Sequence, residues 1–167
     1  MLVRVEAVGD EEAVRQVNRR AFGAEAEGRL VDELRAGGYA RLSLVAEDHG
    51  RIVGLILFSD LPIGAPGGIE NALALAPLAV EPGRQRQGVG SALTREGPRR
   101  CRELGHRIVV VLGHADYYPR FGFAARLAEP LHCPFHSGPA LMALELVPGA
   151  LQGVSGELQY PPPFHIL

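Results

Sequence analysis

Lysine and tryptophan are absent from this chain of 167 residues, and cysteine is scarce. All 17 basic residues are arginine. Without a lysine the chain cannot form the Walker A loop, Gly-x-x-x-x-Gly-Lys-Ser/Thr, whose lysine reaches the phosphates of a nucleotide. The two cysteines, Cys101 and Cys133, do not make a disulfide framework, and no metal-ligand spacing connects them. We therefore expect neither a P-loop enzyme nor a metal site.

The sequence also lacks a charge excess of one sign and any long apolar run. Its formal net charge is −2, which gives no electrostatic reason to expect a nucleic-acid partner. No apolar run approaches the ~18 residues of a membrane-spanning helix. The first residues do not begin the apolar core of a signal peptide. These absences predict a cytoplasmic protein with no membrane partner.

What is present is typical of a globular protein, with 47% apolar and 22% charged residues. The length suits one domain with a full hydrophobic core, so we predict a single domain over residues 1–167. Asp10 suits a helix N-cap. Residues 60–68, with two prolines and three glycines, predict a mobile surface loop. Hydrophobic periodicity predicts strands over 2–7, 43–47, 51–58, 69–80, 107–112 and 140–146, helices after Asp10 and over 26–36 and 89–104, and an end of regular structure at 161–163.

The most informative stretch follows the apolar strand that ends at Val80. The strand breaks at Pro82-Gly83, a polar loop follows, and Gly88-Val89-Gly90-Ser91 opens a helix. Free N–H groups and the dipole at a helix N-terminus attract anions, and glycine lets the backbone approach them closely. The pattern therefore predicts a pyrophosphate site. It does not match the dinucleotide fingerprint Gly-x-Gly-x-x-Gly, because Leu93 stands where the third glycine is required.

The spacing Gln85-x-x-Gly88-x-Gly90 resembles the Gln/Arg-x-x-Gly-x-Gly/Ala signature of the GNAT superfamily of N-acyltransferases. The resemblance implies an α/β GNAT fold, in which a mixed, mostly antiparallel sheet of six or seven strands has helices on both faces. It implies acetyl-CoA as the acyl donor. The resemblance assigns the pyrophosphate to Gln85, Arg86, Gln87, Gly88, Val89, Gly90 and Ser91, and the pantetheine arm to the backbone of Leu78, Ala79 and Val80. Pro77, which lacks a ladder donor, fits the free strand edge that this pairing needs.

A second motif, Tyr118-x-x-x-Gly122-Phe123, resembles the ending of the same family, where the tyrosine lies beside the thioester sulfur. The motif has the form Tyr-Tyr-x-Arg-Phe-Gly-Phe in this chain, which is similar to the YhbS-like subgroup of bacterial acetyltransferases. The closing segments, which start at Pro148 and end at Tyr160-Pro, are similar to that subgroup as well. The Asn and Ala that usually precede the tyrosine are absent, and Val111 and His114 stand in their places.

The resemblance assigns catalytic roles to Tyr118 and Glu70. Tyr118 would protonate the departing thiolate, with Tyr117 as its rival, and a strand N–H near Leu78 or Ala79 would stabilise the oxyanion. Glu70 would act as a base through water, but a solvated carboxylate at a strand end is an equal interpretation, and His114 or water alone are alternatives. Arg84 and Arg86 either contact phosphates or are solvated loop charges.

Together these motifs predict transfer of an acetyl group from acetyl-CoA to a primary amine by direct attack in a ternary complex. The acceptor would be a small-molecule or peptide amine, bound against the loops 23–40, 60–70 and 127–138. One alternative is a non-catalytic acyl-CoA-binding module that senses its ligand, and another is a dinucleotide-binding enzyme that uses the same glycine loop. Dimers are common in the family, so a homodimer stays open, as does the use of longer acyl groups.

Overall fold

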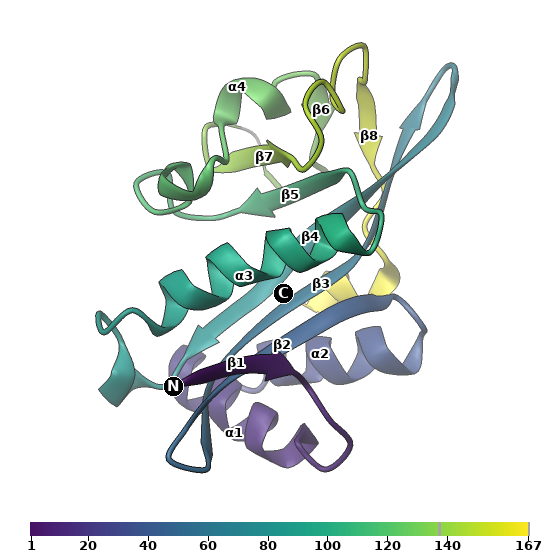
Figure 1. The fold of residues 1–167 in the computed structure, drawn as a ribbon. Helices are drawn as coiled ribbons and strands as arrows, with labels where there is room; N and C mark the ends of the chain where they lie inside the picture. Colours follow the sequence, from purple (N-terminus) through teal and green to yellow (C-terminus); the bar gives the residue numbers. More distant parts are fainter. Residues whose placement is uncertain (137, 167) are drawn as a thin grey trace. The chain divides into compact units, whose positions relative to one another are not determined.

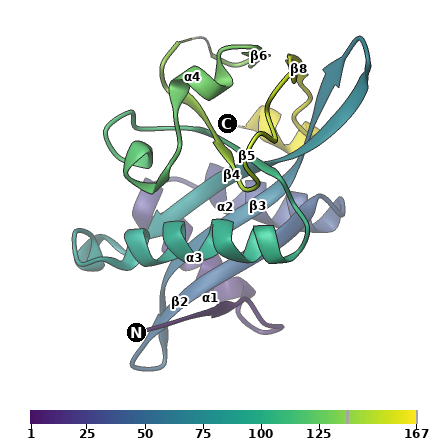
Figure 2. The ribbon, with the colours of Figure 1, turned by 45° about the horizontal axis from the view of Figure 1, so that its top comes forward.

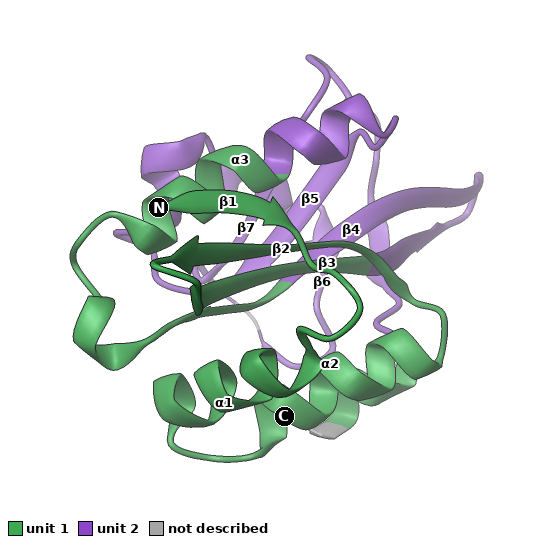
Figure 3. Cartoon of the chain, turned by 60° about the horizontal axis from the view of Figure 1, so that its bottom comes forward, with its two compact units in different colours: residues 1–59, 76–97, 162–167 green, residues 60–75, 98–161 purple. Residues whose placement is uncertain are grey.

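The computed structural model describes residues 1–136 and 138–166. They belong to two compact units (Figure 3). Unit 1 comprises residues 1–59, 76–97 and 162–167, and unit 2 comprises residues 60–75 and 98–161. Three elements are shared between the units: strand β3 (Arg51–Ala65), strand β4 (Gly68–Val80) and helix α3 (Val89–Glu103).

The other elements are shorter (Figure 1). In chain order they are β1 (Leu2–Val5), α1 (Glu11–Phe22), α2 (Ala26–Ala36), β2 (Ala40–Asp48), η1 (Pro82–Arg84), β5 (Ile108–Leu112), η2 (Tyr118–Phe121), α4 (Ala125–Ala128), β6 (Leu131–His132), β7 (Leu141–Glu145), β8 (Gly156–Leu158) and η3 (Pro162–Ile166), where η marks a 3₁₀-helix.

Over the described residues, eight strands form one mixed sheet in the order β1-β2-β3-β4-β5-β7, and β8 pairs with β3 and β6. The pairs β1–β2, β2–β3, β3–β8 and β5–β7 are antiparallel, whereas β4–β5 and β6–β8 are parallel. The predicted α/β class with a mostly antiparallel sheet is confirmed. The predicted number of six or seven strands was too low, because β6 and β8 are too short to produce a periodic pattern.

In unit 1 helices cover both faces of the strands. Figure 3 shows α1 and α2 on one side of β1, β2 and β3, and α3 on the other. Strands covered on both faces bury consecutive residues, which explains why β2 and β3 carry apolar runs rather than a strict alternation. The buried core side chains of this unit include Val14, Val17, Leu30, Leu34, Leu44, Val45, Leu55, Ile56, Leu57, Phe58, Val89 and Leu93.

Two glycines allow α3 to approach β3 closely (Figure 2). A Cβ atom on Gly54 of β3 would lie 2.9 Å from Val89 Cγ1 and 3.0 Å from Leu93 Cδ1. A Cβ atom on Gly97 of α3 would lie 2.6 Å from the Phe58 ring. The helix continues through Pro98. Gly97 therefore has a packing role, and Gly54 keeps the first turn of α3 against the sheet.

Unit 2 overturns the prediction of a mobile loop over 60–68. Residues 60–65 continue β3, residue 68 begins β4, and only a short turn separates the two strands. Leu61 and Ile63 are fully buried, and Ile63 pairs with Leu158 of β8. Proline and glycine disfavour a strand locally, but here the burial of alternating apolar side chains and the pairing with β8 outweigh that preference. Residues 161–163 likewise lead into η3 instead of ending regular structure.

Asp10 does not cap α1 with its side chain, contrary to the prediction. Its carboxylate accepts hydrogen bonds from Arg4 Nη1 at 2.8 Å, from Arg4 Nη2 at 3.3 Å and from the Ala7 N–H at 2.7 Å. The hydrogen bond from Arg4 and then that from Ala7 hold the pKa of Asp10 below its ordinary value. Asp10 thus joins β1 to the start of α1.

We expect Asp10→Asn to lower the free energy of unfolding at pH 7 by about 1 kcal/mol, because a partly exposed charge-assisted contact is lost. Since folding lowers the pKa of Asp10, its stabilisation is present above the unfolded pKa of about 3.9 and is lost as pH falls through the folded pKa. Urea unfolding at pH 7 and at about pH 2.5 should show a smaller difference from the parent at the lower pH. Glu12→Gln, in the exposed pair with Arg15, is the control and should change little. An equal loss at both pH values would contradict this account.

Candidate active site

The predicted anion loop lies in unit 1, directly before α3. The first helical hydrogen bond of α3 runs from the Ala92 N–H to the Gly88 carbonyl at 3.0 Å. The N–H groups of Val89, Gly90 and Ser91 have no acceptor among the described residues, as the geometry of a helix start requires. With the positive end of the helix dipole, they form a set of donors suited to an anion.

The loop backbone adopts two left-handed conformations. Gly88 has φ = 88° and Arg86 has φ = 62°. A non-glycine residue in this region is uncommon and marks a constrained backbone. A Cβ atom on Gly88 would meet no atom within 4 Å, so the backbone borders open space there. The loop can therefore admit a ligand close to the main chain.

Most side chains of the loop turn back onto the protein. Gln85 Nε2 donates to the Val80 carbonyl at 3.3 Å, and Gln87 Nε2 donates to the Gly83 carbonyl at 3.1 Å. Arg84 Nη2 contacts Asp48 Oδ2 at 2.6 Å. Arg86 is exposed and makes no hydrogen bond or ion pair with the part of the chain that the structure describes. Of the two loop arginines, Arg86 is therefore the one available to an anion.

Glu81, the residue after β4, makes contacts with both β3 and α1. The Glu81 N–H donates to the Val53 carbonyl of β3 at 2.9 Å, and Glu81 Oε1 lies 2.6 Å from Arg20 Nε of α1. Along a strand, N–H groups point alternately to the two edges. If Glu81 donates toward β3, so does Ala79, and the N–H groups of Leu78 and Val80 point away from β3. Of the three strand residues predicted to pair with the pantetheine arm, Leu78 and Val80 thus have suitably directed donors.

Tyr118 begins η2 in unit 2, and its side chain is only 7% exposed. Its ring packs edge-on against Tyr117 at a centroid distance of 5.0 Å and against Phe123 at 5.5 Å. A Cβ atom on Gly113 would lie 2.5 Å from Tyr118 Cε2, so the glycine makes room for this ring. Burial, with a smaller contribution from Tyr117, raises the pKa of Tyr118 above its ordinary value. The phenol therefore stays protonated at neutral pH, as a general acid must.

The other predicted catalytic candidates have more exposed positions in unit 2. Tyr117 is partly exposed, and the Arg120 guanidinium lies 4.8 Å from the centre of its ring. Glu70 is partly exposed near the start of β4. His114 is exposed, and its carbonyl accepts the Tyr117 N–H at 3.1 Å. Of these candidates only Tyr118 is buried.

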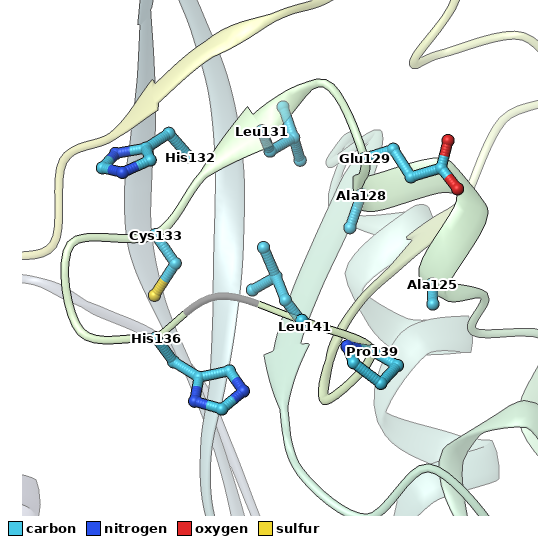
Figure 4. Close-up of a pocket in the computed structure, with 10 residues that line it drawn as sticks. Ala125, Ala128, Glu129, Leu131, His132, Cys133, His136, Pro139 and Leu141 are labelled. Atoms are coloured by element: carbon cyan, nitrogen blue, oxygen red, sulfur yellow. The ribbon is translucent and has the colours of Figure 1, made fainter.

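A cavity of about 460 Å³ lies in unit 2 between α4 and the segment that follows β6 (Figure 4). Leu131, Leu141 and Ala128 supply apolar lining, and Glu129 lies on the α4 side. The Cys133 side chain is buried, and its Sγ lies 4.0 Å from the Tyr160 hydroxyl. Most of its lining residues belong to the segment 127–138, one of the three loops predicted to face the acceptor.

Neither a metal centre nor a membrane span is found within residues 1–136 and 138–166. No group of three or more His, Cys, Asp or Glu side chains is arranged to hold a metal ion there. No helix there has both the length and the apolar character needed to cross a membrane.

The end of β4, a glycine-rich loop and the start of α3 follow one another here, which is the arrangement that the predicted GNAT-type acyltransferase needs for its donor. The acetyltransferase (GNAT) domain family matches residues 3–126, and the chain belongs to this family. It is 36% identical to the N-acetyltransferase YhbS of Escherichia coli over 96% of each chain. It is 45% identical to the E. coli N-acetyltransferase YjhQ over 68% of this chain and 64% of that one.

Solved structures agree with this assignment. A crystal structure of E. coli YhbS in complex with CoA has a TM-score of 0.90 and 34% identity, covering 98% of this chain and 91% of that chain. A GNAT-family acetyltransferase from Brucella melitensis in complex with acetyl-CoA has a TM-score of 0.82 and 35% identity, covering 98% and 97% of the two chains. The predicted family, its fold and its YhbS-like character are confirmed.

Several residues around the predicted site had no signal in the sequence. Gly54 and Gly113 matter through the side chains that they touch, Val89 and Tyr118, and these contacts cross between separate elements. Asp48 contacts Arg84 of the anion loop, 36 positions further along the chain. Local periodicity does not encode the contacts of Gly54 with Val89 and of Asp48 with Arg84, because these residues lie far apart in the chain.

Proposed function

We propose that this protein transfers an acetyl group from acetyl-CoA to a primary amine by direct attack in a ternary complex, acting as a single acetyltransferase domain. The observation that carries the proposal is the start of α3, where three N–H groups without acceptors adjoin Gly88 in a left-handed conformation. This geometry suits a pyrophosphate. The complexes of two relatives with CoA and acetyl-CoA support the same ligand here.

The cofactor residues are those of the loop and the strand end. The N–H groups of Val89, Gly90 and Ser91 hold the pyrophosphate, Gly88 permits its close approach, and Arg86 adds a charge-assisted contact. Gln85 and Gln87 stabilise the loop through side-chain hydrogen bonds to the backbone carbonyls of Val80 and Gly83. The Val80 N–H and the Leu78 carbonyl pair with the amides of the pantetheine arm, which leaves the Leu78 N–H for the oxyanion, and Ala79 holds the strand against β3.

The reaction forms one C–N bond and breaks one C–S bond. The neutral amine attacks the thioester carbonyl, and the oxyanion is stabilised by the N–H of Leu78, which points away from β3. When the tetrahedral intermediate collapses, Tyr118 gives its proton to the departing thiolate, and the second proton that the attacking nitrogen loses returns through water to the Tyr118 phenolate. The raised pKa of Tyr118 keeps the phenol protonated before this step. The ammonium form of the amine first loses a proton to Glu70 through water, with His114 or bulk water as the other candidate bases.

The acceptor is a small-molecule or peptide amine. The cavity beside Cys133 supports an acceptor with an apolar part, because Leu131, Leu141 and Ala128 line it. Acetyl-CoA is a cytoplasmic metabolite, so we place the enzyme in the cytoplasm. A homodimer and the use of longer acyl groups are further proposals that fit the family.

Native mass spectrometry of the purified protein with acetyl-CoA tests the proposal first. We expect one added mass per chain that matches the cofactor, and a rise in melting temperature that grows with ligand concentration. Linkage predicts about 2.7 kcal/mol of added stability at 100 times the dissociation constant. NAD is the matched control ligand and should neither add mass nor stabilise the protein. Binding of NAD in place of CoA would overturn the proposal.

A second measurement separates an enzyme from a ligand-sensing module. A set of amines is tested for release of CoA thiol from acetyl-CoA. Cys101 and Cys133 are both buried, and burial raises the pKa of the Cys101 thiol to about 12, so neither should react with the thiol reagent in the folded protein. Tight binding of acetyl-CoA without thiol release by any amine would favour the sensing module.

A further inference from the structure

The turn between β2 and β3 contacts the anion loop through one ion pair. Asp48 Oδ2 lies 2.6 Å from Arg84 Nη2, across 36 positions of the chain. The Asp48 side chain is 16% exposed and that of Arg84 is 31% exposed. His49 and Gly50 adopt left-handed φ values of 49° and 75°, which shape the tight turn that presents Asp48. The pair is therefore partly shielded and built from a constrained turn.

The contact continues into the loop. Arg84 Nε donates to Gln87 Oε1 at 3.3 Å, and Gln87 Nε2 donates to the Gly83 carbonyl at 3.1 Å. One chain of side-chain contacts thus runs from Asp48 through Arg84 and Gln87 to the loop backbone. Gln87 lies between Arg86 and Gly88, and Arg86 is a non-glycine residue whose left-handed backbone needs external support.

Other charged groups near Asp48 are more distant. The amino group of Met1 lies 3.4 Å from Asp48 Oδ1, and His49 Nε2 lies 3.9 Å from Asp48 Oδ2 with a side chain that is 92% exposed. The hydrogen bond from Arg84 is the main reason that the pKa of Asp48 lies below its ordinary value. At neutral pH the pair has no net charge, so it adds no attraction for an anion, and its role must be geometric.

We propose that Asp48 is a positioning residue for the cofactor loop: by holding Arg84, it keeps the loop in the shape that presents the N–H groups of α3 to a pyrophosphate. This inference rests on the proposed function. Arg84 is then a structural part of the loop, while Arg86 faces the ligand. An uncompensated carboxylate near an anion site would lower affinity, and pairing it with Arg84 removes that cost while bracing the loop.

Calorimetric titration with CoA tests the inference. Asp48→Asn should raise the dissociation constant about tenfold, the effect of losing one charge-assisted contact. The same factor is expected for dephospho-CoA, which lacks the 3′-phosphate but keeps the pyrophosphate. The melting temperature without ligand should stay close to that of the parent, and Asp48→Glu should recover part of the affinity. Asp32→Asn, which breaks a 2.7 Å ion pair with Arg15 elsewhere in unit 1, is the matched control and should leave the dissociation constant unchanged.

A double-variant cycle shows whether Asp48 acts through Arg84. If it does, Asp48→Asn combined with Arg84→Met should bind CoA no more weakly than Arg84→Met alone. Additive losses, or an unchanged dissociation constant in Asp48→Asn, would overturn the inference while leaving the proposed function intact. Failure of the parent protein to bind CoA would instead overturn the proposed function, and with it the role of Asp48 in cofactor binding.

Discussion

Gly88→Val is expected to abolish CoA binding, with a dissociation constant at least about 100-fold higher than that of the parent. Gly88 has φ = 88°, and open space lies where its Cβ would stand. In the proposed function the pyrophosphate occupies that space. A valine side chain would displace the phosphate from the N–H groups of α3, and each lost charge-assisted hydrogen bond is worth about 1.5–3 kcal/mol. Losing one or two of them reaches the 100-fold effect.

Gly38→Val is the control for this experiment. Gly38 follows α2, has φ = 76° and also borders open space, so valine imposes a comparable backbone strain there. Both variants should lose some stability, which thermal unfolding without ligand measures. Only Gly88→Val should lose CoA in calorimetric titration. If Gly88→Val kept its affinity, the start of α3 would not be the pyrophosphate site.

Tyr118→Phe should lower kcat about 100-fold, at the lower end of what general acid catalysis contributes, and leave CoA affinity nearly unchanged. The substitution removes only the hydroxyl. The ring keeps its packing against Tyr117 and Phe123 and its place over Gly113. Turnover is measured as thiol release with an amine identified in the acceptor tests, and affinity is measured by calorimetry.

Tyr117→Phe is the matched control, since it removes a hydroxyl from the adjacent and more exposed ring. It should change kcat little. The raised pKa of Tyr118 gives a second test. A solvated tyrosine, with a pKa of about 10, begins to ionise near that pH, whereas the Tyr118 phenol of the parent should stay protonated there. A large loss in Tyr117→Phe with none in Tyr118→Phe would reverse the assignment of the acid.

Local sequence patterns correctly predicted the elements that contacts between neighbouring residues stabilise. The helix predicted over 26–36 is α2, bounded by the same residues and followed by Gly37. The glycine motif correctly predicted where α3 starts, because the lack of a side chain at Gly88 and the first helical turn act over a few adjacent residues. The same motif led to the family that the comparisons confirmed. A helix start that follows a glycine loop is suited to an anion because its free N–H groups and dipole are local features.

Tertiary contacts decided the features that local patterns misjudged. Residues 60–65 are strand because Leu61 and Ile63 are buried and β8 pairs with them, although the proline and glycine content indicated a loop. Asp10 is bound by Arg4 of β1 rather than capping α1. For residues 60–65 the partner strand is distant in the chain, whereas Arg4 lies only six positions before Asp10 but belongs to a different element.

The difference between what the sequence determines and what the fold determines is clearest at the proposed site. The residues of the proposed cofactor loop can be predicted from the chain, since their expected chemistry depends on adjacent glycines and a helix start. The roles of the two loop arginines could not be separated until folding brought Asp48 to Arg84 and left Arg86 exposed. Tyr118 could be named from its motif, but its burial over Gly113, which raises its pKa, exists only in the folded chain. Charge and burial are properties of neighbours in space, and the fold alone decides which residues become neighbours.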